Sequence, residues 1–166
     1  MGYIEWVIIK DGLQELSLKE YEEEWDTVYG YMVLKLGDYR LGYLEDEWYR
    51  GDIDLPYYIK RVVKCGTEML QGNDYFFQLL DWNLLDLKIY YGKKIKIQVV
   101  HNQKNRIEFE YYISFEDLIN EVQRVYKRYI EDIKNINPII LTTREMRLMD
   151  EDYKIFMEKL IHRRKK

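Results

Sequence analysis

The sequence of 166 residues contains no alanine, only two prolines and two histidines, and a single cysteine, Cys65. One cysteine excludes an internal disulfide and indicates a reducing compartment. No apolar run approaches the ~18 residues that a membrane-spanning helix needs. The first residues, GYIEWVIIK, contain an acidic side chain and lack the basic-then-apolar pattern of a secretory signal. These absences predict a cytoplasmic protein that does not enter a membrane.

Motifs of common catalytic and nucleotide-binding sites are missing as well. No GxGxxG pattern and no GxxxxGK followed by Ser or Thr occurs. Ser17 and Ser114 are the two serines, and Ser114 is explained as a helix cap. Cys65 falls on the apolar face of a predicted helix, where thiols are usually inert. Because no nucleophile, base and orienting group form a set, the sequence favours a protein that is not an enzyme and needs no cofactor.

The composition is that of a folded protein with an uneven distribution of charge. Hydrophobic residues make up 47% and charged residues 34%, which is typical of a globular chain. Residues 1–58 hold 14 Asp and Glu against 5 Lys and Arg, a net charge of −9, whereas residues 59–166 hold 16 against 21, a net charge of +5. If folding keeps these halves apart, one face is strongly acidic and attracts cationic partners.

Alternating β-branched and aromatic residues predict strands separated by short turns. Gly37-Asp38 and Gly92-Lys93 are turn dipeptides, and connections this short make neighbouring strands antiparallel. Residues 11–26 are polar and acidic, and the pattern leaves open whether they form a loop or a short helix. The predicted strands cover residues 3–10, 28–36, 39–44, 75–80, 84–91, 94–101 and 106–113.

Three amphipathic helices are predicted from capping residues and apolar periodicity. Asp54 and Pro56 open the first helix, which Gly72-Asn73 ends. Ser114 caps the longest helix, with Asp117 in a capping-box position and Asn137-Pro138 at the end. The last helix is predicted from about Asp150. We therefore expect an α+β fold, a mainly antiparallel sheet packed on one face by amphipathic helices. It would form a single domain, strand-rich over 1–113 and helical over 114–162, with a basic tail at 163–166.

One segment, YLEDEWYRGDIDLPYY at residues 43–58, interleaves carboxylates with large aromatic side chains. Carboxylates steer a basic partner, and Trp and Tyr supply contact area at low entropic cost. The pattern predicts a binding surface for a basic protein. Its candidate residues are Glu45, Asp46, Glu47, Trp48, Tyr49, Asp52 and Asp54, joined by a second acidic cluster at Glu22, Glu23, Glu24 and Trp25.

Three alternatives stay open at this point. The same carboxylates could bind Mg²⁺ in a metal-dependent hydrolase, although their spacing does not match a calcium-loop motif. The aromatic residues could instead form a homodimer interface in a self-associating structural protein. A basic stretch from Lys93 to Arg106, with Tyr90 and Tyr91, resembles a nucleic-acid contact. The net charge of −4 argues against nucleic acid, because binding domains of that kind are usually basic.

The segment YYISFEDLINEVQRVYKRYIEDIKNINP, at residues 111–138, joins a strand to a long helix through a serine cap. Together with the small α+β domain and the acidic aromatic segment after a hairpin, it is similar to the small cytoplasmic immunity proteins that accompany bacterial polymorphic toxins. This resemblance implies an inhibitor that binds one toxin domain and blocks its active site or substrate groove. Toxic nuclease domains are commonly basic, so an acidic aromatic surface would suit such a partner.

Overall fold

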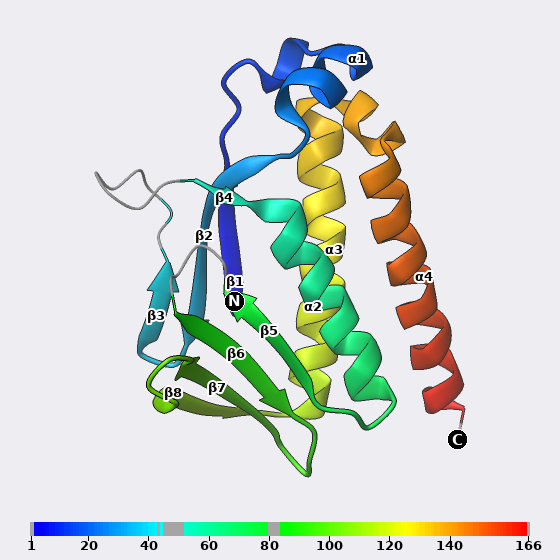
Figure 1. The fold of residues 1–166 in the computed structure, drawn as a ribbon. Helices are drawn as coiled ribbons and strands as arrows, with labels where there is room; N and C mark the ends of the chain where they lie inside the picture. Colours follow the sequence, from blue (N-terminus) through cyan, green and yellow to red (C-terminus); the bar gives the residue numbers. More distant parts are fainter. Residues whose placement is uncertain (1, 43, 45–51, 80–83, 166) are drawn as a thin grey trace.

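The predicted α+β fold is confirmed, with its strands divided between two antiparallel sheets (Figure 1). The computed structural model describes residues 2–42, 44, 52–79 and 84–165. In the first sheet, β2 (Tyr29–Leu36) is central and pairs with its three neighbours, β1 (Ile4–Ile8), β3 (Tyr39–Gly42) and β4 (Ile53–Asp54). The second sheet is a meander of β5 (Tyr75–Leu79), β6 (Leu85–Tyr90), β7 (Ile95–His101) and β8 (Arg106–Ile113).

The helices begin where their caps predict, except for the last one. Asp54 accepts a hydrogen bond from Tyr57 N at the start of α2 (Leu55–Leu70), and Ser114 forms a capping box with Asp117 at the start of α3 (Phe115–Ile136). The prediction that the last helix starts near Asp150 is wrong. Thr143 caps α4, which runs over Arg144–Arg164 after a short 3₁₀ segment, η3 (Pro138–Thr142), and so includes two residues of the expected basic tail.

The helices lie together on one side of the sheets, with α4 outermost (Figure 1). Gly66 on α2 allows the close approach of α4, because a Cβ at this position would lie 2.8 Å from the Phe156 ring. Tyr126 on α3 and Tyr153 on α4 stack with their ring centroids 3.7 Å apart. Since the contact is close-packed, α4 is a fixed third layer of the core.

Residues 11–26, which the sequence left open, form three short helical turns at one end of the molecule. They are η1 (Leu13–Glu15), α1 (Leu18–Glu20) and η2 (Tyr21–Trp25). Ser17 caps α1, and the Glu20 carboxylate accepts a hydrogen bond from Ser17 N in return. The segment is therefore locally ordered by its own capping box.

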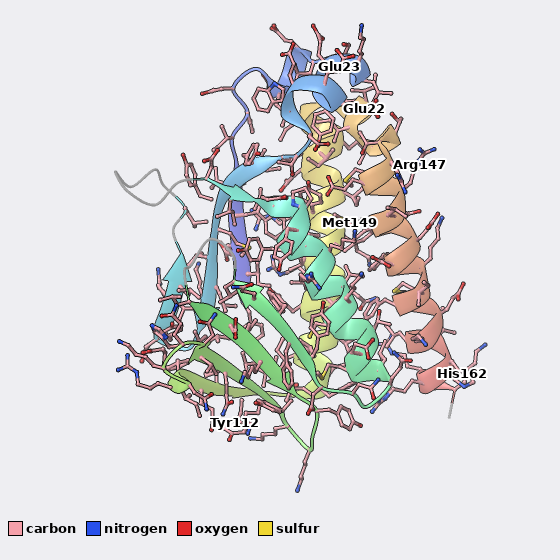
Figure 2. All side chains as sticks on the ribbon, viewed as in Figure 1. Glu22, Glu23, Tyr112, Arg147, Met149 and His162 are labelled. Carbon is pink, nitrogen blue, oxygen red and sulfur yellow. The ribbon has the colours of Figure 1, made fainter. Side chains whose placement is uncertain are left out.

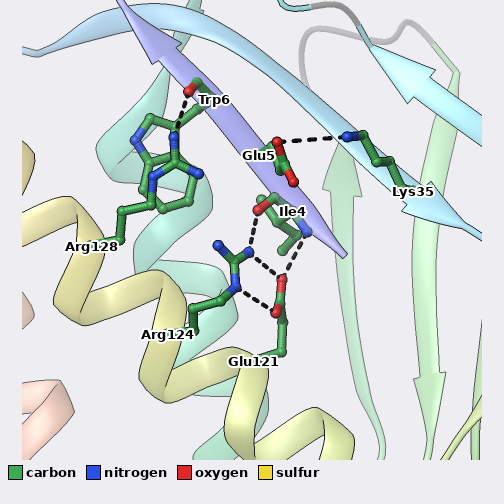
Figure 3. A network of polar contacts seen from close by, with 7 residues as sticks. All are labelled: Ile4, Glu5, Trp6, Lys35, Glu121, Arg124 and Arg128. Carbon is green, nitrogen blue, oxygen red and sulfur yellow. Dashed lines mark hydrogen bonds and ion pairs between the residues drawn. The ribbon is translucent and has the colours of Figure 1, made fainter. Parts of the chain in front are cut away.

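Side chains of α3 bind the outer edge of β1, where no strand of the described residues pairs with it (Figure 3). Ile4 N donates to Glu121 Oε1 at 2.8 Å, and Arg124 donates to Ile4 O. Further along, Arg128 donates to Trp6 O at 3.1 Å and lies 4.3 Å above the Trp6 ring. An open strand edge is a site of aggregation and an unpaired amide is costly when buried, so this network protects the edge and attaches α3 to the first sheet.

We predict that Glu121→Ala lowers the free energy of unfolding by about 2–3 kcal/mol, because the Ile4 amide loses its acceptor and the Arg124 guanidinium loses its carboxylate partner. Urea denaturation measures the change. Glu131→Ala, an exposed position on the same helix, should change stability by less than about 0.5 kcal/mol. Equal, small effects of both substitutions would show that the β1 edge does not depend on Glu121.

Candidate functional site

Residues 11–26, here called the acidic cap, concentrate negative charge at one end of the molecule. They hold seven carboxylates and one lysine, a net charge of −6. All seven carboxylate residues are exposed, and Figure 2 shows Glu22 and Glu23 projecting from this end. Within the described part of the chain, Lys19 with Glu23 at 3.9 Å is the only ion pair in the acidic cap. The remaining charge is therefore available to a partner.

The acidic cap is anchored to the helices by buried contacts beneath it. Leu13 and Tyr21 point into the core with 0% and 4% of their surface exposed. Asn137, at the end of α3, donates to Leu13 O at 3.0 Å and to Leu16 O at 2.9 Å. Because these bonds satisfy carbonyls that no helix partner reaches, the exposed carboxylates stand on a fixed support.

The fold brings parts of the two acidic clusters together, although almost thirty residues separate them in the sequence. Glu22–Asp26 directly precede Thr27, whose hydroxyl donates to Asp54 Oδ1 at 2.9 Å. The short strand β4 pairs with the start of β2, placing Asp54 opposite Tyr29. Asp52, two residues before Asp54, is exposed. The end of the acidic cap therefore lies beside Asp54 at the start of α2.

The predicted binding residues fall into three groups. Glu22, Glu23 and Glu24 are exposed, and Trp25 is half-buried against Gly12. Asp54 is half-buried and accepts hydrogen bonds from Tyr57 N and the Thr27 hydroxyl. Its role is therefore structural. The predictions for the central residues, Glu45, Asp46, Glu47, Trp48 and Tyr49, lie outside the described residues.

Glu145 lies beneath the acidic cap, in the first turn of α4, and the sequence analysis missed it. Burial raises the pKa of this carboxyl to about 7, with Asp54 and Asp26 adding to the effect and Lys60 opposing it. A helix N-terminus favours a carboxylate, but here burial and the two neighbouring carboxylates outweigh that preference. Glu145 stood in a segment without a clear helical period, so its neighbours could not be inferred.

Two tyrosines complete the polar cluster around Glu145. Tyr129 on α3 is fully buried and its hydroxyl has no hydrogen-bond partner within the described residues. Burial raises its pKa, and the charges of Tyr21, Glu145 and Asp54 act in the same direction. Burial likewise raises the pKa of Tyr21. The cluster is an electrostatically unfavourable junction beneath the acidic cap.

The described residues contain no group of three or more His, Cys, Asp or Glu side chains arranged to hold a metal ion. Cys65 is buried, and burial raises the pKa of its thiol to about 12, which suits a packing residue. Among the described helices, none combines the length and apolar character needed to cross a membrane. The chain matches no protein-family model, no curated protein and no solved structure.

We predict that Glu145→Gln stabilises the protein in a pH-dependent manner. The unfolded carboxyl releases its proton near pH 4.5 and the folded one near pH 7, so between these values the folded state binds more protons and wild-type stability falls as pH rises. The shift corresponds to about 3 kcal/mol before screening. Because Glu145 is partly exposed, we expect Glu145→Gln to gain about 1–2 kcal/mol at pH 8 and almost nothing at pH 4.5.

Urea denaturation at both pH values measures this gain. Glu151→Gln, at an exposed position of the same helix, is the control and should give the same small change at both pH values. A Glu145→Gln effect that does not vary with pH would contradict the electrostatic account of this junction.

We further predict that Asn137→Ala detaches the acidic cap from α3. The substitution removes two hydrogen bonds to the carbonyls of Leu13 and Leu16 and should cost about 2 kcal/mol. Amides of residues 11–26 should exchange with deuterium faster than in the wild type, whereas amides of β6 and β7 keep their relative order of protection. Unchanged exchange in residues 11–26 would mean that Asn137 does not anchor them.

Proposed function

We propose that the chain is a non-enzymatic binding module that recognises a basic protein through the acidic cap together with Asp52. One observation carries the proposal: β4 pairs with the start of β2, so that Asp54 lies beside Thr27, the residue that follows the acidic cap. Within the described residues, the exposed carboxylates of the acidic cap form a single ion pair. Concentrated negative charge destabilises the folded state through self-repulsion. A basic partner that neutralises this charge relieves the repulsion.

Charge of this kind acts mainly on the rate of association. Exposed carboxylates raise the on-rate for a basic partner by 10-fold or more at low salt, while each exposed ion pair adds only about 0.2–1 kcal/mol of affinity. Slow dissociation needs a desolvated anchor. Trp25, half-buried at the margin of the acidic cap, is the described side chain that suits this role. Trp48 and Tyr49 stay predicted anchors.

The resemblance to immunity proteins suggests which kind of basic protein the chain would bind. The strand–serine cap–helix unit that carries the resemblance is β8, Ser114 and α3. An immunity-type inhibitor would mask a basic toxin domain, for example a nuclease whose groove binds a polyanion. The single cysteine supports a cytoplasmic location, where such an inhibitor protects the cell that makes the toxin.

The experiment compares two triple charge reversals with the same change in net charge. Glu22→Lys, Glu23→Lys and Glu24→Lys alter the acidic cap, whereas Glu131→Lys, Glu151→Lys and Glu158→Lys alter exposed positions on α3 and α4. Each protein is used to capture partners from a bacterial lysate, and the Kd of a retained protein is then measured by calorimetry. We expect a basic protein that binds the wild type and the α3–α4 variant, with affinity for the acidic-cap variant about 10- to 100-fold weaker.

Two results would reject the proposal. One is a retained protein that binds both triple variants with the same affinity, which would place its contact elsewhere. The other is the capture of no basic protein by the wild type at low salt, where electrostatic association is strongest.

A further inference from the structure

The outer side of the second sheet carries aromatic rings and lysines, and no described helix covers it. On the inner side, Leu87, Ile89, Ile97 and Val99 are buried. Burial does not alternate on β7, because Gln98 and Val100 of the outer side are buried as well. On the outer side, Phe76, Ile107 and Tyr112 are 52%, 53% and 52% exposed. We call this outer side the aromatic sheet face, defined by Phe76, Lys88, Tyr90, Lys96, Ile107 and Tyr112. Exposed large apolar side chains gathered on one sheet face mark an interaction site.

The aromatic sheet face places its rings and cations in register across the strands. Tyr90, Lys96 and Tyr112 lie directly opposite one another on β6, β7 and β8, and the next row pairs Phe76 with Lys88. The Phe76 and Tyr90 rings lie 5.3 Å apart, and Lys96 Nζ lies 4.4 Å from the centre of the Tyr90 ring. With strands about 4.8 Å apart, the rings span roughly 15 Å.

The carboxylates of β8 near this face accept hydrogen bonds from neighbouring side chains, and Lys96 lies over the Tyr90 ring. Glu110 accepts hydrogen bonds from Tyr112 Oη and Gln98 Nε2, both at 2.6 Å. Glu108 accepts two from Arg106. In contrast, Lys88 and Lys96 form no ion pair within the described residues. Residues 84–113 hold six Lys and Arg against three Asp and Glu, a net charge of +3 in a chain whose total is −4. The segment that forms β6–β8 is therefore basic in a chain that is acidic in total, although Asp86 and Glu110 lie on the same face as Lys88 and Lys96.

We propose that the aromatic sheet face binds single-stranded nucleic acid. Unpaired bases stack on exposed rings, and lysines between the rings neutralise the phosphates that link them. A four-stranded sheet with exposed rings accommodates about two or three bases. The alternation of ring and cation suits a strand of bases and phosphates better than an apolar protein surface, because Lys96 interrupts the apolar contact between Tyr90 and Tyr112. A duplex offers no free base faces to this flat surface.

This site is independent of the acidic cap and lies at the other end of the molecule. In Figure 2, Tyr112 projects from the end opposite Glu22 and Glu23. The negative charge of the acidic cap is therefore kept away from a bound polyanion, and over such a distance salt screens it.

Fluorescence anisotropy tests the proposal with fluorescein-labelled 12-nucleotide oligo(dT) and oligo(U), and with a labelled DNA duplex of 12 base pairs. We expect both single strands to bind in 50 mM salt more tightly than the duplex does. Phe76→Ala and Tyr112→Ala should each weaken binding about tenfold through lost stacking. Lys88→Glu with Lys96→Glu should reduce the slope of log K against log salt by about 1.4, the value for two phosphate contacts on a single strand.

The matched control is Lys127→Glu with Lys134→Glu, which reverses two exposed lysines on α3 and should leave the salt slope unchanged. Circular dichroism confirms that each variant is folded. Absence of single-strand binding by the wild type at 100 μM protein would overturn the proposal, as would tighter binding of the duplex. Equal losses in the sheet and α3 double variants would also overturn it. Self-association through this face without oligonucleotide binding, measured by sedimentation, would assign the surface to a second copy instead.

Discussion

The attachment of α3 to the free edge of β1 is the constraint on which the other arrangements depend. Glu121, Arg124 and Arg128 lie along one stripe of the helix and bind the backbone of Ile4 and Trp6. At 22 residues, α3 is about 33 Å long. Its N-cap, Ser114, follows β8 directly, and its C-cap, Asn137, binds the acidic cap. One helix therefore fixes the distance between the second sheet, the first sheet and the acidic cap.

Because α3 fixes these parts, the uneven distribution of charge along the sequence becomes a separation of charge in the folded molecule. The acidic cap carries a net charge of −6 in 16 residues, and the stretch that forms β6–β8 carries +3 in 30. Sequence alone does not fix where these charges go, because strands of the two halves could have interleaved. They form separate sheets instead, and the rigid helix holds the charged ends apart. An acidic end and an aromatic face that carries lysines, held apart on one body, suit two different partners.

Local chemistry made most of the elements predictable. The Ser114 and Asp54 caps, the Gly37-Asp38 turn and the strand–turn spacing of β5–β8 are short-range signals, and the structure confirms each of them. The start of α4 was missed because Met146 and Met149 are its only buried residues before Phe156, too few to show a helical period. The division into two sheets was also missed, since it depends on contacts between distant strands.

The candidate site was predictable in its charges but not in its geometry. Glu22, Glu23 and Glu24 are exposed as a run of like charges suggests. The meeting of Thr27 with Asp54 depends on β4 pairing with β2, and a two-residue strand leaves almost no pattern in the sequence. The role of Glu121 could not be predicted, because its backbone partner Ile4 lies 117 residues away in the sequence. Glu145 stood in a segment without a clear helical period, so its burial could not be predicted either.

The separation of the two charged surfaces is most directly tested by chemical-shift mapping of the ¹⁵N-labelled protein with two probes, a decalysine peptide and oligo(dT). We predict that decalysine shifts amide resonances in residues 11–26 and 52–54, while oligo(dT) shifts those around Phe76, Tyr90 and Tyr112. Shifts in the same residues with both probes, or shifts spread evenly over the molecule, would contradict it.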